Sequence, residues 1–259
     1  MEEPSLKGLS VLVTGASRGL GAALGRRLGR AGARLALVAR GGEALEAVAR
    51  EIRDAGGEAH ALAGDVGDKR DAHRLAGAAM ALVGPLDVVV HNASTLGAVP
   101  LRLLLETDCE DLERVLAVNL VGPFRLTKIV AGAMALRRRG LVVHVSSDAA
   151  VAAYPRWGAY GVSKAAQDHL GRVLAAELEG TGVRVVSVDP GEMNTRMHAD
   201  AIPDADPATL ADPDAVASRL AALIARPEAY APNGGRVELA RVPVELGPEE
   251  TTSPAEARP

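Results

Sequence analysis

Residues 10–21 read SVLVTGASRGLG, an apolar run that passes directly into a glycine-rich turn. The run has the length of a buried strand, and the apolar spacing beyond the turn predicts a helix. Gly15, Gly19 and Gly21 permit a tight turn, a close approach of the main chain to a pyrophosphate and close packing of helix on strand. Amides at the start of such a helix bind phosphate oxygens. Glycine-rich turns also occur where nothing binds, but a turn between a first strand and a first helix favours the phosphate site.

The alternation of strand and helix that begins here continues along the chain. Apolar runs of strand length lie at residues 10–13, 34–39, 58–63, 86–91, 141–145, 183–188 and 236–241. Helical patterns lie at residues 20–31, 43–55, 69–83, 109–138, 160–179 and 214–225. Most strand candidates are continuously apolar, which is typical of parallel strands covered on both faces. We expect one doubly wound, Rossmann-type α/β domain over residues 1–246, with a parallel seven-stranded sheet and helices on both faces.

Composition narrows the classes of protein to consider. The 259 residues carry a net charge of −4 and only 2% aromatic residues, which argues against nucleic-acid binding. The single cysteine, Cys109, excludes an internal disulfide and fits a cytoplasmic protein. We find neither a signal peptide nor an uninterrupted apolar run of about 18 residues, and so expect no membrane span. Residues 247–259 are rich in Pro and Glu and are expected to form a mobile tail.

The end of the second predicted strand concerns the choice of cofactor. This strand ends at Ala39 and is followed by Arg40. An NAD site usually places Asp or Glu at such a strand end to bind the ribose 2′-hydroxyl. Here that carboxylate is missing, and Arg40 together with Arg18 of the turn suits a 2′-phosphate; the alternative is that Arg40 is a solvated loop residue. Asp65 ends the third strand and either accepts a hydrogen bond from an adenine amino group or caps the next helix.

A second stretch with chemical potential, residues 146–164, follows the apolar run 141–145. Tyr160 and Lys164 stand four apart in a helical pattern, so the phenol and the ammonium share one helix face. A free tyrosine has a pKa near ~10, and a neighbouring cation lowers that pKa toward the working range of an acid or base. Ser147 stands at a strand end, where its hydroxyl would hydrogen-bond a substrate oxygen. A Tyr–Lys pair at this spacing is also common on ordinary amphipathic helices, so the surrounding motifs decide its meaning.

Residues 194–213 differ from their surroundings. Pro203, Pro207 and Pro213 stand there among Asp and Ala, after the carboxyl end of a predicted strand. That edge of an open α/β sheet is where ligands bind. A loop of this length is either disordered or a lid, and we favour the lid.

With these pieces in order, the sequence resembles the short-chain dehydrogenase/reductase family, from about residue 9 to residue 242. TGASRGLG at 14–21 resembles the family's cofactor turn, and Pro190-Gly191 with Thr195 resembles its PG-x-x-x-T motif. HNAS at 91–94 resembles the family's NNAG and departs from it at His91 and Ser94. Asn119, Ser147, Tyr160 and Lys164 are similar to the family's catalytic tetrad in order and spacing.

The resemblance implies a role for each of these residues. Tyr160 would exchange a proton with the substrate oxygen, and Lys164 would lower the pKa of Tyr160 and bind the nicotinamide ribose. Ser147 would polarise the carbonyl, and Asn119 would support a water that passes protons toward Lys164. The expected cofactor contacts are Gly15, Ser17, Arg18, Gly19, Leu20, Gly21, Arg40, Asp65, Val66, Asn92, Ala93, Tyr160, Lys164, Pro190, Gly191, Met193 and Thr195. No metal site is expected.

The residues that flank the predicted catalytic tetrad indicate the character of the substrate pocket. They are Thr95, Leu96, Asp148, Ala149, Tyr154, Trp157, Met193 and Met197. Tyr154 and Trp157 suggest a pocket wall for an apolar or ring-bearing substrate, or else an oligomer contact. Asp148 either binds a polar group or faces solvent, and His144 within an apolar strand is expected to be a core residue.

We therefore predict an NADP(H)-dependent oxidoreductase that acts on a small-molecule carbonyl or alcohol. It is expected to prefer NADP(H) over NAD(H), and to form a homodimer or homotetramer through helices 109–138 and 160–179. The alternative is an NADP(H)-binding regulator or scaffold without catalysis. A P-loop hydrolase is excluded because no GxxxxGK[ST] motif is present.

Overall fold

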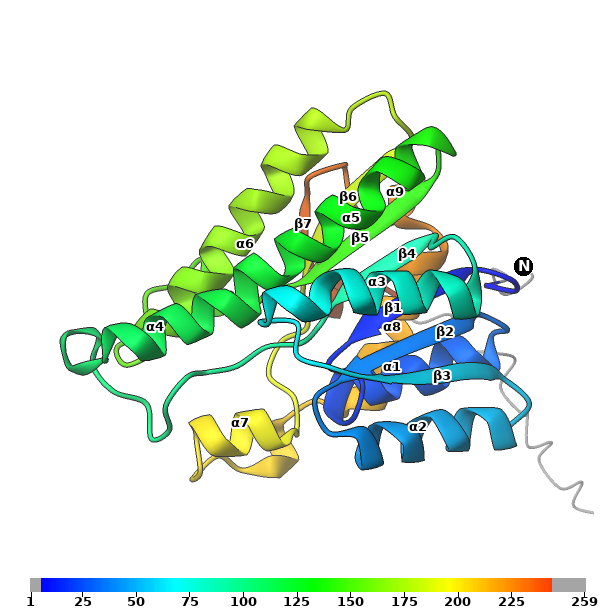
Figure 1. Cartoon of the computed structure of the whole chain (residues 1–259). Coiled ribbons are helices and arrows are strands. Elements are labelled where there is room, and N and C mark those ends of the chain that lie inside the picture. Colours follow the sequence, from blue (N-terminus) through cyan, green and yellow to red (C-terminus); the bar gives the residue numbers. More distant parts are fainter. Residues whose placement is uncertain (1–5, 244–259) are drawn as a thin grey trace, which may run out of the picture.

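In the computed structural model, which describes residues 6–243, seven parallel strands form one sheet in the order β3-β2-β1-β4-β5-β6-β7 (Figure 1). The strands are β1 Ser10–Thr14, β2 Arg34–Ala39, β3 Glu58–Ala63, β4 Val88–His91, β5 Gly140–Val145, β6 Val183–Asp189 and β7 Arg236–Glu238. The direction in which the chain adds strands to the sheet reverses between β1 and β4. Ligands of doubly wound sheets bind at that point, outside the carboxyl ends of the strands.

Helices cover both faces of this sheet (Figure 1). They are α1 Gly19–Arg30, α2 Gly42–Asp54, α3 Lys69–Val83, α4 Cys109–Leu116, α5 Gly122–Leu136, α6 Gly158–Glu177, α7 Arg196–Ala201, α8 Pro213–Ala225 and α9 Pro227–Tyr230. Side chains alternate between the faces along each strand, so Val11 and Val13 pack on one side and Leu12 on the other. The predicted doubly wound α/β fold is confirmed for the described residues, and the predicted tail at 247–259 lies outside them.

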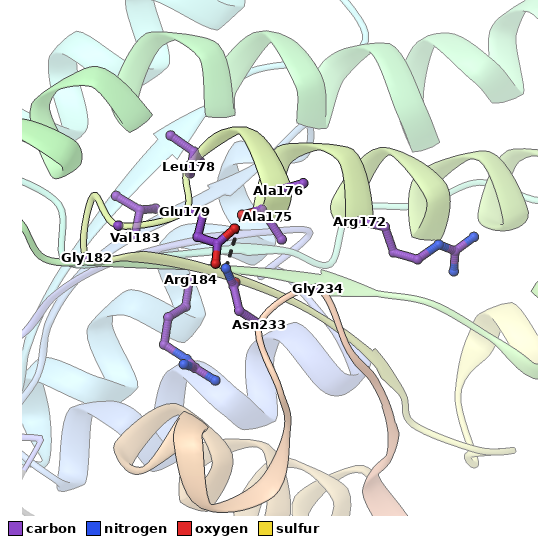
Figure 2. A pocket seen from close by; sticks show the side chains of 11 residues that line it. Arg172, Ala175, Ala176, Leu178, Glu179, Gly182, Val183, Arg184, Asn233 and Gly234 are labelled. Carbon is purple, nitrogen blue, oxygen red and sulfur yellow. Dashed lines mark hydrogen bonds between the residues drawn. The ribbon is translucent and has the colours of Figure 1, made fainter.

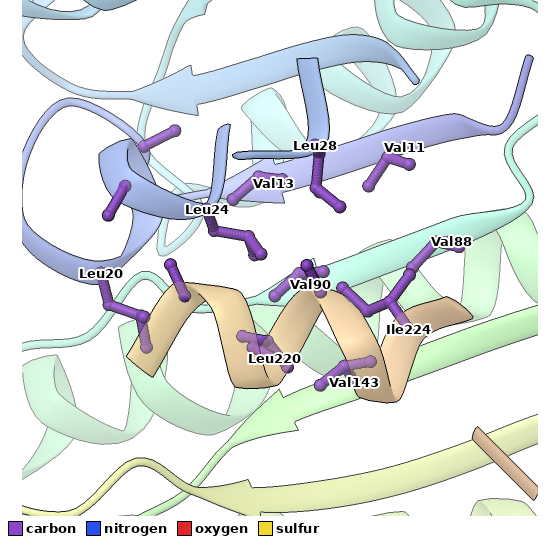
Figure 3. Close-up of a cluster of buried hydrophobic side chains, with 14 of the residues drawn as sticks. Val11, Val13, Leu20, Leu24, Leu28, Val88, Val90, Val143, Leu220 and Ile224 are labelled. Carbon is purple, nitrogen blue, oxygen red and sulfur yellow. The ribbon is translucent and has the colours of Figure 1, made fainter. Parts of the chain in front are cut away.

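The core on one face lies between the sheet, α1 and α8 (Figure 3). Leu24 and Leu28 of α1 and Leu220 of α8 are fully buried there, and they meet Val13 and Val90 of the sheet. A second core beneath α3 and α5 covers the other face. Because both faces are covered, the strands are continuously apolar, as the sequence indicated.

The predicted helix 109–138 is interrupted by a π-helical turn, Ala117–Val121. Pro123 lies in the first turn of α5 and has no N–H to donate to the carbonyl of Asn119, four residues earlier. The helix widens at this place, and such π turns are frequent at functional sites. The turn buries Asn119 completely.

The last predicted strand, 236–241, is shorter than expected. Only Arg236–Glu238 pairs with β6, because β6 itself ends at Asp189 and leaves no further partner. Leu239–Arg241 instead forms a 3₁₀ turn. Residues 194–213 are ordered: they contain α7, and Met193 pairs with Ala211 as an isolated bridge.

Within the described part of the chain, one helical stretch, Cys109–Leu136, is long and apolar enough to cross a membrane, with a mean hydropathy of 1.3. However, 44% of that window is buried inside the protein. Leu126, Val130 and Met134 pack from it onto the sheet. Core helices of soluble proteins share these properties, and the absence of a membrane span stays a prediction.

Candidate active site

The glycine-rich turn after β1 is held by the loop that follows β4. Gly15 has φ +69°, and a Cβ there would lie 2.8 Å from the Cα of Ala93. The amide nitrogen of the Asn92 side chain donates to the main-chain oxygens of Thr14 (2.9 Å) and Gly15 (3.1 Å). A Cβ at Gly21 would collide with the carbonyl oxygen of Gly15. Asn92 and Ala93, which we expected as cofactor contacts, thus lie directly behind the turn and shape it.

The start of α1 offers an anion site. No side chain caps the helix at Arg18, and the first turn contains no acidic residue, so its amides are free to bind a ligand. The amide of Ala16 donates to the carbonyl of Val38 (3.1 Å), which brings the turn against the end of β2. Arg18 and Arg40 are both exposed, and their guanidinium groups make no hydrogen bond or ion pair with any residue that the structure describes. These features fit a dinucleotide with an additional phosphate.

Asp65 does not cap the next helix. Its Oδ1 accepts a hydrogen bond from the amide of Gly67 (2.9 Å), and Asp68 caps α3 by accepting from the amide of Arg70 (2.8 Å). The helix-capping alternative for Asp65 was therefore wrong, and its contact with an adenine stays a prediction. Val66 beside it is buried in the core under α3 and α5.

Ser147, Tyr160 and Lys164 come together where β5 and α6 meet. Lys164 lies on α6 one turn after Tyr160, with its Nζ 5.6 Å from the centre of the Tyr160 ring. This Nζ donates to the carbonyl of Val145 (2.6 Å) at the end of β5. Ser147 Oγ donates to Asp148 Oδ1 (2.9 Å) and accepts from the amide of Ala149 (3.2 Å). The i, i+4 spacing and the strand end thus place the three groups as the sequence predicted.

Burial governs the ionisation of this pair. It raises the pKa of Tyr160 to about 12, although a hydrogen bond with Ser147 acts in the opposite direction. Burial also lowers the pKa of Lys164 to about 8, partly offset by the carboxylate of Asp168. Lys164 was expected to lower the pKa of Tyr160. Loss of water from the phenol raises its pKa, and the groups that act against this rise are the hydroxyls of Ser147 and Ser94 rather than Lys164, so the expected lowering does not appear.

Asn119 connects the loop after β4 with α6. Its Oδ1 accepts from the amide of Thr95 (2.8 Å), and its Nδ2 donates to the carbonyl of Thr95 and to Ser163 Oγ, both at 2.9 Å. Both donors of the side chain are therefore occupied. Ser163 directly precedes Lys164, so Asn119 holds the helix that carries the Tyr–Lys pair.

The segment after β6 borders the candidate site on the side opposite the loop after β4. Gly191 adopts φ +73°, and its amide donates to Asp189 Oδ1 (3.0 Å), which forms the turn after Pro190. Thr195 caps α7 by accepting from the amide of His198. Its methyl group would lie 3.4 Å from a Cβ at Gly19, so this segment reaches the glycine-rich turn.

A cavity of about 340 Å³ opens in front of Ser147 and Tyr160. Most of the residues that line it were singled out from the sequence, either as catalytic or cofactor-binding residues or as residues that flank the predicted centre. The wall consists of Leu96, Ser146, Ser147, Asp148, Ala149, Tyr154, Trp157, Tyr160, Asp189, Pro190, Gly191, Glu192, Met193, Thr195, Met197, His198 and Ile202. Tyr154 and Trp157 line it, and the Tyr154 hydroxyl donates to Asp148 Oδ2 (2.9 Å). Among these lining residues there is no Lys or Arg.

The sequence did not identify Ser146, Asp189, Glu192, His198 and Ile202 as part of this wall. His198 lies in α7 and Ile202 directly follows it. Both belong to the segment that we expected to be a lid, and this was the only feature of the sequence that indicated a place near the cavity. Thr95, which we expected beside the centre, does not line the cavity, and its main chain is bonded to Asn119.

A larger hollow of about 630 Å³ lies elsewhere (Figure 2). It is formed by the last turn of α6, the amino end of β6 and the loop before β7, whereas Ser147 lies at the carboxyl end of β5. Two of its polar side chains donate to the main chain: Asn233 to Ala175 (3.2 Å) and Arg184 to Ala231 (2.6 Å). We assign no chemistry to this hollow.

His144 is fully buried, as expected of a core residue, and its ring centre lies 5.2 Å from that of His91 on β4. Burial lowers the pKa of His144 to about 4, so both the position and the charge state suit a core residue. The described residues hold no group of three or more His, Cys, Asp or Glu that fits a metal ion.

Known proteins resemble this chain in sequence. A sequence profile described as short chain dehydrogenase matches residues 10–206. A short chain dehydrogenase of Pseudocercospora fijiensis is 36% identical over 197 residues, which are 75% of this chain and 62% of that protein's length. The 3beta-hydroxysteroid dehydrogenase 1 of Eggerthella lenta is 36% identical over 202 residues, 77% of this chain and 76% of that protein.

Solved structures resemble the chain over most of its length. A metagenomic short-chain oxidoreductase in complex with NADP is 35% identical, with a TM-score of 0.75, and the match covers 86% of this chain and 93% of the other. An NAD⁺-bound xylitol dehydrogenase is 26% identical, with a TM-score of 0.80, and the match covers 90% and 98%. Both nicotinamide cofactors therefore occur among the structural neighbours.

Proposed function

Since the chain belongs to the short chain dehydrogenase family of NAD(P)-dependent oxidoreductases, we propose that it transfers a hydride between NADP(H) and a small-molecule carbonyl or alcohol, with Tyr160 as the general acid or base. The observation that carries this proposal is the convergence of Ser147 and Tyr160 on one apolar cavity, with Lys164 buried behind them. A cofactor sensor without catalysis would not need an acid and a hydroxyl donor aimed into such a cavity.

The cofactor, when bound, supplies or accepts the hydride, and the protein manages the proton. In reduction, the Ser147 hydroxyl orients the carbonyl oxygen, and Tyr160 donates its proton to that oxygen as negative charge develops on it. A pKa of about 12 keeps Tyr160 protonated at neutral pH until that moment. The Lys164 ammonium favours the phenolate that forms on Tyr160. Pro123 leaves the main-chain carbonyl of Asn119 without its α-helical donor, and this carbonyl would hold a water that carries protons.

We propose a preference for NADP(H) over NAD(H) because of the positive charge near the end of β2. Arg18 and Arg40 are exposed there, no carboxylate stands at Ala39, and guanidinium groups suit a 2′-phosphate. The metagenomic neighbour that binds NADP supports the preference for NADP(H). Because the xylitol dehydrogenase neighbour binds NAD⁺, this preference has to be measured.

The cavity also suggests a substrate class. Its volume of about 340 Å³ lies at the small end of ligand pockets, ~300–1,000 Å³. Leu96, Trp157 and Met197 form apolar walls, and the carboxylates of Asp148 and Glu192 make the site unfavourable for an anion. We propose an uncharged, ring-bearing ketone or secondary alcohol. The ring-bearing substrate named for the steroid relative is compatible with this class.

The test is a panel of ketones of graded size, followed through NADPH absorbance in wild type and in the Tyr160→Phe variant. The variant should lose activity by roughly 10²–10⁴-fold while NADPH still binds, since only the proton donor is removed. Tyr230→Phe, a change on α9 away from the cavity, is the matched control and should leave the rate unchanged. Tight NADPH binding without turnover of any ketone would favour the regulator or scaffold instead.

We further propose a cytoplasmic homo-oligomer of even order. α5 and α6 expose apolar side chains, with Phe124 40%, Val162 50% and Val173 40% accessible, and a second copy would cover them. Sedimentation should show a dimer or tetramer at micromolar concentration, and a monomer would contradict the proposal.

A further inference from the structure

Arg236, the first residue of β7, extends to the back of the proposed catalytic serine. Its Nη2 donates to the main-chain oxygen of Ser147 (3.0 Å) and to Asp189 Oδ2 (2.7 Å). Its Nε lies 3.3 Å from Asp168 Oδ2. The side chain is only 22% exposed, and those of Asp168 and Asp189 are 5% and 9% exposed. One guanidinium therefore contacts three groups that lie far apart in the sequence.

Each of these partners belongs to a different wall of the proposed site. Ser147 follows β5 and supplies the hydroxyl that faces the cavity. Asp168 lies on α6 one turn after Lys164, and its Oδ2 also accepts from Ser146 Oγ (2.9 Å). Asp189 ends β6 and holds the turn at Gly191 through its other oxygen (3.0 Å). The guanidinium thus joins the loop after β5, the helix of the Tyr–Lys pair and the turn after β6.

The chemistry of the contact requires an arginine. Two carboxylates this deeply buried are costly unless a cation and hydrogen bonds compensate them. A planar guanidinium presents several donors in a fixed fork, so it can contact both carboxylates and the Ser147 oxygen at once. An ammonium is a point charge and reaches fewer of these groups from the same backbone position.

We propose that Arg236 is a positioning residue that holds the Ser147 loop in register with α6, so that the Ser147 hydroxyl and Tyr160 face the same substrate oxygen. This inference rests on the proposed function. Arg236 lies beyond the residues that the family profile matches, 10–206, so the profile does not assign it. It acts through the main chain of Ser147 and does not line the cavity.

The test compares Arg236→Ala with Arg184→Ala. Arg184 is the matched control, since it is also part-buried on a neighbouring strand and also donates to a main-chain oxygen, that of Ala231, but at the larger hollow. For Arg236→Ala we expect kcat to fall by roughly 10–100-fold, the size of a small misplacement of a reacting group. The KM for the ketone should change by less than about threefold, because Arg236 does not line the cavity.

Added guanidinium ion at non-denaturing concentration should restore part of kcat in Arg236→Ala and none in Arg184→Ala. Arg236→Lys, which keeps the charge, should retain an intermediate kcat. Hydrogen exchange gives a readout that does not need turnover: amides of residues 146–150 should exchange faster in Arg236→Ala than in wild type or Arg184→Ala.

An unchanged kcat with unchanged exchange at residues 146–150 would overturn the role of Arg236. Equal losses in both alanine variants, without rescue by guanidinium, would also overturn it and indicate general destabilisation. Wild-type protein that turns over no ketone would count against the proposed function, and the exchange measurement alone would then decide for or against Arg236. If Arg236→Ala does not fold, Arg236→Lys with the same measurements decides.

Discussion

The cofactor preference can be reversed at the end of β2 by the double change Ala39→Asp and Arg40→Leu. Wild type offers exposed guanidinium groups at Arg40 and Arg18, neither paired with a described residue. A 2′-phosphate would therefore not have to displace an existing partner. In the variant, the carboxylate introduced at the strand end would accept a hydrogen bond from a 2′-hydroxyl and repel a 2′-phosphate.

The size of the effect follows from the exposure of these groups. A hydrogen bond to a charged group contributes roughly 1.5–3 kcal/mol, or about ten- to a hundredfold in affinity. Both arginines are exposed, so solvent and salt screening move the expectation to the lower end. We expect wild type to prefer NADPH over NADH by at least about tenfold in kcat/KM, with a smaller preference at high salt. The variant should prefer NADH.

The assay is kcat/KM for NADPH and for NADH, in both proteins, at low and at high salt. Glu43→Gln, a charge change in the first turn of α2, is a control for general changes of charge near β2. Equal values for the two cofactors in wild type, or a preference for NADH, would refute the assignment of Arg40. A preference that does not respond to salt would refute its electrostatic origin.

Three further expectations follow from the site. Lys164→Met should abolish turnover. It should nevertheless be more stable than wild type at pH 7 in urea unfolding by roughly 1–3 kcal/mol, because the gain of about 3 kcal/mol from removing a buried ammonium with a folded pKa of about 8 against 10.5 is offset in part by the lost hydrogen bond to the Val145 carbonyl. That advantage should shrink between pH 8 and pH 10.5, since the folded lysine is then neutral and wild-type stability rises; a constant advantage would argue against the shifted pKa. Gly21→Ala should lower the melting temperature and weaken NADPH binding in a fluorescence titration because its Cβ collides with the Gly15 carbonyl, whereas Gly77→Ala, with open space around it, should not. A ketone with a carboxylate on its ring should be at least about tenfold poorer in kcat/KM than its uncharged analogue, since the wall carries Asp148 and Glu192 and no Lys or Arg. Equal values would count against the proposed substrate class.

Much of the fold was predictable because parallel strands buried on both faces must be continuously apolar, and most of the seven strands carry this pattern. The errors lie where the partner of a segment decides its structure. β7 ends at Glu238 because β6 provides no further main-chain partner, a fact absent from the apolar run 236–241. The π turn at Ala117–Val121 was missed, although Pro123 in the sequence is the residue that leaves the Asn119 carbonyl without its α-helical donor.

The site divides in the same way. Tyr160, Lys164 and Ser147 were identified because their placement depends on helix periodicity and on a strand end, both of which are local. The cavity wall at His198 and Ile202 depends on how α7 folds back over the sheet edge, and no local pattern encodes that path.

Most elements, their order, the glycine turn and the spacing of the proposed catalytic groups could be predicted from the residue pattern, because these depend on backbone conformations and periodicities within a few residues. The contact between Arg236 and Ser147, 89 residues apart in the chain, and the raised rather than lowered pKa of Tyr160 depend on the folded arrangement of distant segments. Contacts and desolvation depend on which distant segments exclude water from a group. The same tyrosine four residues before a lysine would therefore titrate differently on an exposed helix.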